Sequence, residues 1–382
     1  MRIAVFTETF LPKIDGIVTV VCLLLDHLNK RGIETAVVAP KMGVDHYGQT
    51  PVIGVPGVTF PLYPELRIGP PTLSTYQQLK TFSPDIAHLI HPVLIGTPGL
   101  LMAKRLNIPT VASFHLDVSR IAHHYHMGFI EPAMDLFTRM VFNAADRALA
   151  PSRLIQQDME RIGIRNVALW RRGVDAEKFN PRFRSEAMRD ALSGGHPERT
   201  ILLYVGRLGH EKQIDHLRPV LDAVPGTCLA IVGDGPARSD LERTFAGTNT
   251  RFMGFMKGET LSTAYASADI FTFPSALETF GLVVVEAMAA GLPVVASRVG
   301  GVRDVVQEGR TGYTFESGDV EELVNGVRAI AANRAVMRQM GRDARAFAET
   351  QTWDAMMDEV IVLYETLLAE RGRLPLLAEH VG

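Results

Sequence analysis

The chain has few cysteines and no long uninterrupted apolar run, and both shortages limit what it can be. Only Cys22 and Cys228 occur among its 382 residues, far apart and without the spacing of metal ligands. A reduced, cytoplasmic setting is therefore expected. The N-terminus lacks the apolar core of a signal peptide, and the longest apolar run, residues 281–296, is interrupted by Glu286. The sequence predicts neither a signal peptide nor a transmembrane helix.

Several functional motifs are also missing. The absence of G-x-G-x-x-G argues against a two-domain dehydrogenase. No basic run with interleaved aromatic residues suggests nucleic-acid binding. Net charge is only −3 but is unevenly distributed: residues 1–184 carry 20 Lys and Arg against 15 Asp and Glu, whereas the remainder carries 19 against 27. A basic half can favour contact with an anionic membrane surface, although chance variation between domains would give the same imbalance.

The pattern along the chain is one of strands alternating with helices. In the first half, apolar strands are expected at residues 2–7, 34–39, 52–55, 86–90, 110–113 and 148–151. A second alternating unit begins at Thr200, with strands at residues 201–205, 229–232, 252–254, 270–273 and 312–315. This order predicts an α/β fold with two doubly wound parallel sheets. The proline-rich residues 56–71 are interpreted as a loop.

The most informative stretch is residues 275–297, SALETFGLVVVEAMAAGLPVVAS. It predicts a loop carrying Glu278, then a helix carrying Glu286 that stops at Gly291 and Pro293. At the helical rise, eight residues correspond to ~12 Å. This exceeds the roughly 5 to 9.5 Å between two carboxylates that act on one glycosidic bond. The pair therefore suits an extended ligand that is bound at both ends.

Backbone N–H groups at the start of this helix could bind a phosphate between the two glutamates. An uncapped helix start offers hydrogen-bond donors and the positive end of the helix dipole. A diphosphate flanked by hydroxyl groups, as in a sugar nucleotide, fits this arrangement. An isolated glutamate pair on a solvated helix remains the simpler alternative. The candidate hydrogen-bond donors are the backbone N–H groups of Thr279, Phe280 and Gly281.

The E-x7-E pattern, followed by G-x-P-V-V-A and the pair Gly300-Gly301, resembles the retaining glycosyltransferases of family 4. The resemblance spans nearly the whole chain. It implies the GT-B architecture, in which two Rossmann-like domains face a central cleft. It also implies that Glu278 contacts hydroxyl groups of the donor sugar and that Glu286 contacts the ribose.

Other positions match patterns of the same family. Gly206-Arg207-Leu208-Gly209-His210-Glu211-Lys212 is similar to its phosphate-binding loop, which implies that Arg207 and Lys212 neutralise the diphosphate. The resemblance further places Gly16 near the donor phosphate, a functional histidine at His115, and the nucleobase near Met253. Asp234 lies in a tight turn expected at the same sheet edge as the phosphate-binding loop. The predicted catalytic residues are His115, Glu278, Arg207 and Lys212; the predicted donor-binding residues are Gly16, Gly206, Asp234, Met253, Thr279, Phe280, Gly281, Leu282 and Glu286.

No metal or other cofactor is expected. Arg207, Lys212 and helix N-termini can hold the charge of a leaving diphosphate, and neither expected loop contains Asp-x-Asp. His123, His124 and His126 invite a metal interpretation, but no helical i, i+4 pair with a nearby carboxylate supports one, and a surface or acceptor-site loop is favoured. The amphipathic residues 130–142 are expected to pack in the core, with membrane contact as the minor alternative.

The expected domains follow from the family pattern G-V-D-x-x-x-F-x-P, which begins at Gly173 and closes the first domain. We predict an N-terminal acceptor-binding domain over residues 1–184 and a polar linker over 185–198. A nucleotide-sugar-binding domain is predicted over residues 199–352, and a final helix in 353–382 that returns to the N-terminal domain.

The sequence identifies the sugar donor and the acceptor less clearly than it identifies the family. L-W-x-x-G-V-D and V-G-R-L-G-x-E-K resemble the sulfolipid synthases, whereas E-x-F-L-P-x-x-x-G and Asp117-Val118 resemble actinobacterial mannosyltransferases. A UDP-sugar such as UDP-sulfoquinovose with a lipid acceptor such as diacylglycerol is favoured. GDP-mannose and a glycolipid are the alternative. A nucleotide-sugar epimerase or a noncatalytic nucleotide-sugar binding protein would belong to other classes. A lipid acceptor would place the protein in the cytoplasm, peripheral at the inner face of the membrane.

Overall fold

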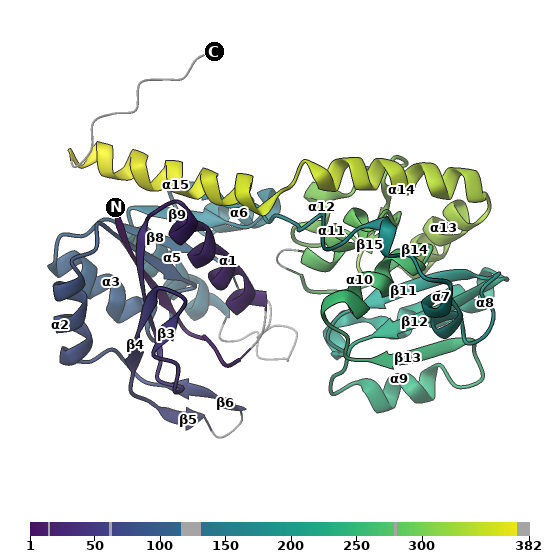
Figure 1. The fold of residues 1–382 in the computed structure, drawn as a ribbon, viewed down its shortest axis with the longest axis horizontal. Coiled ribbons are helices and arrows are strands. Elements are labelled where there is room, and N and C mark those ends of the chain that lie inside the picture. Colours follow the sequence, from purple (N-terminus) through teal and green to yellow (C-terminus); the bar gives the residue numbers. More distant parts are fainter. Residues whose placement is uncertain (14–15, 61–62, 116–130, 279–280, 373–382) are drawn as a thin grey trace, which may run out of the picture. The chain divides into compact units, whose positions relative to one another are not determined.

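The computed structural model describes residues 1–13, 16–60, 63–115, 131–278 and 281–372. The chain divides into two compact units (Figure 1). Unit 1 contains residues 1–171 and the chain from residue 354 onward, and unit 2 contains residues 172–353. Unit 1 is thus built from two separate segments of the sequence.

Unit 1 is built on an eight-stranded sheet in the order β10-β9-β8-β7-β1-β2-β4-β3. All neighbours pair in parallel except β3 and β4. The central strands are almost completely buried, as continuous apolar runs require when helices cover both faces. The strands are β1 (Arg2–Thr7), β2 (Glu34–Pro40), β3 (His46–Tyr47), β4 (Thr50–Val55), β7 (Ile86–Ile90), β8 (Thr110–Ser113), β9 (Arg147–Ala150) and β10 (Val167–Leu169).

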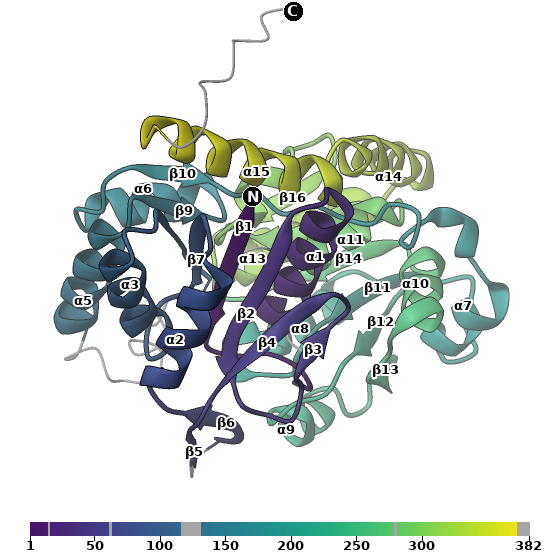
Figure 2. The same cartoon turned by 60° about the vertical axis from the view of Figure 1, so that its left-hand side comes forward.

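Helices cover both faces of this sheet, with α1 on one side and α3 and α5 on the other (Figure 2). The predicted cap Ser152 is confirmed, because its Oγ accepts a hydrogen bond from the N–H of Ile155 at 3.2 Å. The helices of this unit are α1 (Gly16–Lys30), α2 (Leu73–Phe82), α3 (Gly96–Arg105), α5 (Glu131–Ala144), α6 (Arg153–Arg161) and α15 (Trp353–Glu370).

Helix α15 is bound to the N-terminal segment by buried and charged contacts. The buried His27 of α1 lies 3.1 Å from Asp354 and 2.7 Å from Asp358 through its two ring nitrogens. Further along α15, the buried Tyr364 hydroxyl lies 2.6 Å from Nδ1 of His88 on β7. Arg147 pairs with Glu370 near the end of the helix. These contacts explain why this helix belongs to unit 1.

The loop predicted for residues 56–71 is wrong in part, because β5 (Val58–Phe60) and β6 (Tyr63–Ile68) form a two-stranded antiparallel ribbon. Proline normally argues against a strand, since it donates no ladder hydrogen bond. Each strand of a two-stranded ribbon has one unpaired edge, so Pro64 is tolerated within β6.

The interpretation of residues 130–142 as core packing holds only in part. Val141 and Phe142 of α5 are buried in the core of unit 1. Leu136 and Met140, one helical turn apart, are instead 48% and 65% exposed. The helix therefore carries a second, outward-facing apolar stripe that periodicity alone did not separate from the core.

Unit 2 is built on a six-stranded, wholly parallel sheet in the order β13-β12-β11-β14-β15-β16. The strands are β11 (Thr200–Val205), β12 (Thr227–Val232), β13 (Thr250–Gly254), β14 (Ile270–Phe273), β15 (Val294–Ser297) and β16 (Gly312–Phe315). The α-helices are α7 (Glu186–Ser193), α8 (Leu217–Ala223), α9 (Arg238–Thr244), α10 (Gly258–Ser267), α11 (Leu282–Ala289), α12 (Val302–Val305), α13 (Val320–Ala331) and α14 (Arg334–Glu349). Short 3-10 helices are η2 (Pro181–Phe183), η3 (His210–Lys212) and η4 (Ile214–His216).

Residues 185–198, predicted as a linker, are an integral part of unit 2. They contain α7, which starts at the cap Ser185. Arg189 of α7 is 3% exposed and donates hydrogen bonds to the carbonyls of Pro197, Ser267 and Arg199. It also pairs with Asp269 at 2.8 Å. Several polar residues of the segment, such as Glu186 and Glu198, are exposed, but Arg189 is polar because its guanidinium is buried among acceptors.

We expect Arg189→Leu to destabilise unit 2 by about 3 to 5 kcal/mol, because Asp269 would lose its buried countercharge. Urea unfolding followed by circular dichroism measures the change. Arg184→Ala is the control, since Arg184 directly precedes the segment and its side chain is 43% exposed. Equal stability of the Arg189 variant and the wild type would contradict a structural role for this residue.

Candidate active site

The candidate site lies at the point in the sheet of unit 2 where the order of the strands reverses. β11 is flanked by β12 on one side and β14 on the other, so the chain leaves the centre of the sheet in opposite directions. In parallel α/β sheets, ligands bind at the carboxyl ends of the strands at this kind of switch point. The loop after β11 carries Arg207 and Lys212, and the loop after β14 carries Glu278. The topology therefore brings together the residues that the sequence singled out.

Lys212 and Glu278 are in direct contact. Nζ of Lys212 lies 3.2 Å from Oε2 of Glu278 and donates to the carbonyl of Leu277 at 3.1 Å. It also lies 5.4 Å from the centre of the Phe273 ring, within cation–π range. The two charged side chains are 17% and 18% exposed. This partly desolvated ion pair joins the loops that follow β11 and β14.

Arg207 is held differently. Its guanidinium pairs with Glu211 at 3.1 Å, but 58% of the arginine side chain is exposed. Such a pair contributes little to stability, so the guanidinium can exchange this carboxylate for another anion at small cost. Glu211 also connects the two loops, because its carbonyl accepts the N–H of Ala276 at 2.8 Å.

The loops after β11 and β12 touch through their backbones at two glycines. Gly206 and Gly233 have φ of 154° and 134°, and a Cβ on Gly233 would lie 1.9 Å from the carbonyl oxygen of Gly206. Only glycine permits this approach. The predicted donor-binding residue Asp234 follows at once; its carboxylate accepts the N–H of Gly235 at 2.8 Å and contacts Arg238 at 3.3 Å. Met253 lies on β13, partly buried against the core.

Helix α11 begins as predicted with an open N-terminus. Gly281, with φ of 71°, occupies the cap position, and no described side chain caps the helix. Leu282 is its first residue. Thr279 and Phe280, the other predicted backbone donors, lie outside the described residues. The estimate of ~12 Å between the two glutamates assumed continuous helix. It does not apply, because only residues 282–289 are helical.

Glu286 lies on α11 and is partly buried. Its Oε2 accepts a hydrogen bond from the hydroxyl of Tyr265 at 3.0 Å. Burial raises the pKa of Glu286 to about 7, opposed by this hydrogen bond and by the charge of Lys178. The sequence singled out residues 265–269 only as the segment before the strand and assigned Tyr265 no role. A tyrosine on the buried face of an amphipathic helix gives no signal of its partner.

In unit 1, His115 follows β8 and is only 2% exposed. Its Nε2 lies 2.8 Å from Oγ of Ser113, and its ring packs edge-on against buried Trp170. Gly16 is the first residue of α1, and a Cβ added there would meet no atom within 4 Å. The assigned roles of both residues remain predictions.

Glu8, just after β1, is a second residue to which the sequence assigned no role. Its carboxylate accepts the backbone N–H groups of Val93, Ile95 and Gly96 at 2.8 to 3.0 Å, at the start of α3. Burial raises the pKa of Glu8, while these hydrogen bonds oppose the shift. β1 and β7 are adjacent, and the chain continues from β1 toward one edge of the sheet and from β7 toward the other. Glu8 therefore fixes the loop between β7 and α3 at the switch point of unit 1.

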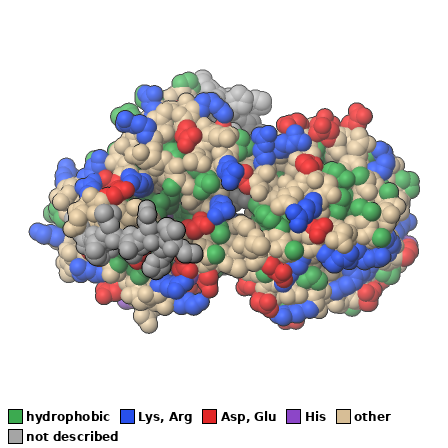
Figure 3. All heavy atoms as spheres, turned by 90° about the horizontal axis from the view of Figure 1, so that it is seen from above, with side chains coloured by type: hydrophobic (Ala, Val, Ile, Leu, Met, Phe, Trp, Pro, Cys, Tyr) green, Lys and Arg blue, Asp and Glu red, His purple; other side chains and the backbone are tan. Residues whose placement is uncertain are grey.

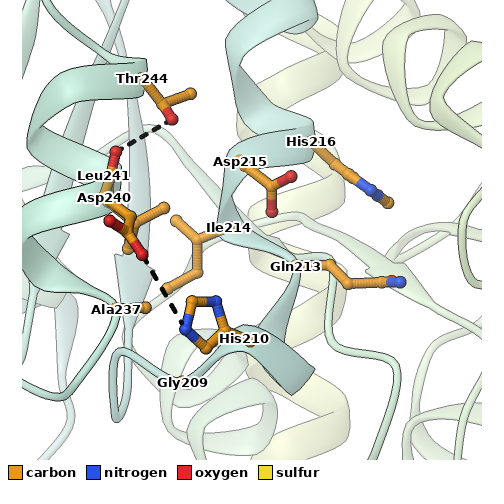
Figure 4. A pocket seen from close by; sticks show the side chains of 10 residues that line it. All are labelled: Gly209, His210, Gln213, Ile214, Asp215, His216, Ala237, Asp240, Leu241 and Thr244. Carbon is orange, nitrogen blue, oxygen red and sulfur yellow. Dashed lines mark hydrogen bonds and ion pairs between the residues drawn. The ribbon is translucent and has the colours of Figure 1, made fainter. Parts of the chain in front are cut away.

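A separate hollow of about 350 Å³ lies beside α9, η3 and η4 (Figure 4). The side chains of Asp240 and His210 approach one another on one side of it at 4.0 Å, whereas those of Gln213 and His216 point away from them. Its lining residues are Gly209, His210, Gln213, Ile214, Asp215, His216, Ala237, Asp240, Leu241 and Thr244. It contains none of the predicted site residues.

Within the described residues, no group of three or more His, Cys, Asp or Glu side chains could hold a metal ion. His123, His124, His126, Asp117 and Val118 lie outside those residues. No described helix has both the length and the apolar composition needed to cross a membrane. On the described part of the face drawn in Figure 3, basic and acidic side chains are intermixed.

Comparison with known proteins places these features in a family. Residues 14–178 match Glycosyltransferase Family 4, and residues 191–347 match Glycosyl transferases group 1. The chain is 38% identical to the sulfoquinovosyl transferase SQD2 of Arabidopsis thaliana, over 94% of this chain and 72% of that protein. It is also 38% identical to a GDP-mannose-dependent alpha-mannosyltransferase of Mycolicibacterium smegmatis, over 97% of this chain and 99% of that one.

Solved structures agree in fold. Sucrose-phosphate synthase from Thermosynechococcus elongatus has a TM-score of 0.78 at 21% identity, covering 97% of this chain and 99% of that one. HepE of Anabaena, solved in complex with UDP, has a TM-score of 0.77 at 18% identity, covering 95% and 99%. The predicted α/β fold of GT-B type is thereby confirmed. With two parallel-sheet units, a cation–carboxylate pair at a switch point and relatives at 38% identity, the chain belongs to glycosyltransferase family 4.

Proposed function

We propose that the protein transfers a sugar from a nucleoside diphosphate carrier to a lipid acceptor with retention of anomeric configuration, and that the preferred donor is a UDP-sugar such as UDP-sulfoquinovose. The observation that carries the proposal is the pair of Lys212 and Glu278 at the switch point of unit 2. In this pair a cation, which would bind phosphate, lies next to a carboxylate, which would accept hydrogen bonds from sugar hydroxyl groups.

The leaving diphosphate would be held by three groups. Arg207 would exchange Glu211 for the phosphate and bind it with its planar fork. Lys212 would add a point charge, and the uncapped start of α11 would add N–H donors. Together they stabilise the charge that develops as the bond between the sugar carbon and the phosphate oxygen breaks, which is why a metal is not expected to be required.

In the proposed reaction, the acceptor hydroxyl attacks the same face of the sugar from which the diphosphate leaves. A bond forms between the acceptor oxygen and the anomeric carbon, and the acceptor proton passes to the departing phosphate oxygen. Glu278 would orient the sugar through its hydroxyl groups, while Glu286 would hold the ribose. Catalysis then comes from orientation and electrostatics, not from a protein nucleophile.

The lipid acceptor is supported by the relatives and by the surface of unit 1. Relatives named for lipid products include an alpha-monoglucosyldiacylglycerol synthase of Acholeplasma laidlawii, 26% identical over 98% of this chain. The exposed stripe of Leu136 and Met140 on α5 adjoins the exposed Arg139, and Leu101 of α3 is 53% exposed beside Lys104. Apolar and basic side chains together favour peripheral contact with an anionic membrane.

GDP-mannose and a glycolipid acceptor form the second candidate. The chain spans 99% of the Mycolicibacterium mannosyltransferase but only 72% of the plant sulfoquinovosyl transferase. The chain is equally identical to both relatives, but its length agrees better with that of the mannosyltransferase, and this supports the alternative. The charged pair at the switch point would serve either nucleotide equally, because its proposed partners are the diphosphate and the sugar, not the base.

Replacing Lys212 or Glu278 with alanine should lower the rate of sugar transfer by about 10²-fold or more, because each removes a charge that stabilises the transition state. Initial rates with saturating donor and acceptor measure the effect. Arg328→Ala is the control, since the side chain of Arg328 is exposed and, among the described residues, bonds only Asn325 of its own helix. Full activity in either site variant would overturn the proposed roles.

Gly16→Val tests the predicted approach of the donor to unit 1. A Cβ at this position meets no atom within 4 Å, so the melting temperature should stay unchanged. We expect the KM for the donor to rise by about tenfold or more, since the added methyl groups would occupy the space of a phosphate or sugar. An unchanged KM would remove Gly16 from the donor site.

A panel of UDP, GDP and ADP should separate the two donor candidates. A ligand that binds only the folded protein raises its melting temperature, and saturation at 100 times Kd corresponds to about 2.7 kcal/mol. We expect UDP to give the largest shift. A larger shift with GDP would favour the mannosyl alternative, and no shift with any of them would contradict a nucleoside diphosphate donor. Release of free nucleotide only when diacylglycerol or glycolipid vesicles are added would confirm transfer to lipid.

A further inference from the structure

Tyr265 lies on α10 and is completely buried. Its ring packs edge-on against Phe179 at 5.4 Å between ring centres and lies 5.8 Å from the ring of Phe271. These contacts fix the position of the phenol oxygen. Because the residue lies in the interior of unit 2, its hydroxyl needs a hydrogen-bond partner there.

That partner is the carboxylate of Glu286. The Tyr265 hydroxyl donates to Oε2 at 3.0 Å, and the carbonyl of Val283 lies farther away at 3.4 Å. Burial and the neighbouring carboxylate raise the pKa of Tyr265 well above its ordinary value, so the phenol keeps its proton and acts as a donor. Within the described residues, no group donates a hydrogen bond to Oε1 of Glu286. This oxygen is also not one of the fully buried polar atoms that lack a partner, so it is accessible to solvent. It therefore remains open to a ligand.

Few other charged groups face Glu286. Lys178, from the segment before η2, contributes a favourable charge. On α14, Arg345 is engaged by the carbonyls of Ala176, Phe179 and Ala289 and by Glu349 at 2.7 Å. β14 and β15 carry no ionisable side chain. Burial thus has the largest effect on the pKa of Glu286, and Tyr265 and then Lys178 are the groups that oppose it.

We propose that Tyr265 is a positioning residue for the donor: its hydroxyl holds Oε2 of Glu286 so that Oε1 accepts hydrogen bonds from the diol of the ribose. This inference rests on the proposed function, since it assigns Glu286 to the sugar of the nucleotide. It extends that function, because nucleotide affinity then depends on whether Glu286 is protonated.

The direction of the pH dependence follows from the chemistry. The diol donates hydrogen bonds, so it binds the carboxylate, whose oxygens are only acceptors and carry charge, more strongly than the carboxylic acid. The pKa of Glu286 is raised to about 7, so the acid form predominates below neutral pH and the carboxylate above it. Nucleotide affinity should therefore rise with pH through the neutral range. Loss of the Tyr265 hydrogen bond would raise this pKa further and move the transition to higher pH.

The test compares wild type with Tyr265→Phe. The Kd for UDP and GDP is measured by calorimetry from about pH 6 to about pH 9, and the KM for the donor is measured over the same range. We expect the variant to bind about tenfold more weakly at neutral pH, to regain wild-type affinity at high pH and to keep its kcat. Tyr313→Phe is the matched control, because the hydroxyl of Tyr313 bonds no described residue; its profile should equal that of wild type.

Two further variants keep the test decisive. Glu286→Gln should abolish the pH transition, since it removes the titrating group. Replacing Tyr265 with a fluorotyrosine, a stronger donor of nearly the same shape, should move the transition to lower pH. An equal loss of affinity at every pH in Tyr265→Phe, or an unmoved transition with fluorotyrosine, would overturn the positioning role. Failure of wild type to bind any nucleoside diphosphate would instead refute the proposed function.

Discussion

The arrangement of the candidate site depends on one partly buried ion pair between loops that follow neighbouring strands. Lys212 and Glu278 come from sequence positions far apart, and the parallel order of β11 and β14 brings their loops to the same sheet edge. Each charge reduces the cost of desolvating the other. The ammonium group of Lys212 is held by this carboxylate, by the carbonyl of Leu277 and by the ring of Phe273. An incoming diphosphate would have to compete for that lysine, so the site exchanges one anionic partner for another.

The strands of both units could be predicted well because most of them are buried on both faces. Strands such as β1, β7 and β14 begin and end at the expected residues, since a largely apolar run bounded by polar or turn residues has few other interpretations. The cations and glutamates of the site were also found from sequence. Arg207, Lys212 and Glu278 lie in the segments directly after such strands, where position along the sheet follows from topology, whereas Glu286 lies on α11.

Features defined by pairwise contact could not be predicted. Arg189 looked like part of a polar linker because nothing local reveals that carbonyls and Asp269 surround it. Tyr265 and Glu8 received no role for the same reason, since their partners lie elsewhere in the chain. The separation of the two glutamates was derived for continuous helix, whereas α11 begins only at Leu282, after Gly281 in the left-handed region. A hydrophobic pattern records burial but not the identity of the neighbour.

The discontinuity of unit 1 limits how the protein can be divided. A fragment ending at residue 171 would omit α15, and with it the hydroxyl that bonds His88 and the carboxylates that flank His27. Both imidazoles would lose partners in the interior, and the apolar side chains beneath α15 would meet water. Independent production of this half would therefore require a short peptide joining residue 171 to residue 354. Unit 2 interrupts unit 1 as an insertion and could be excised between those two points.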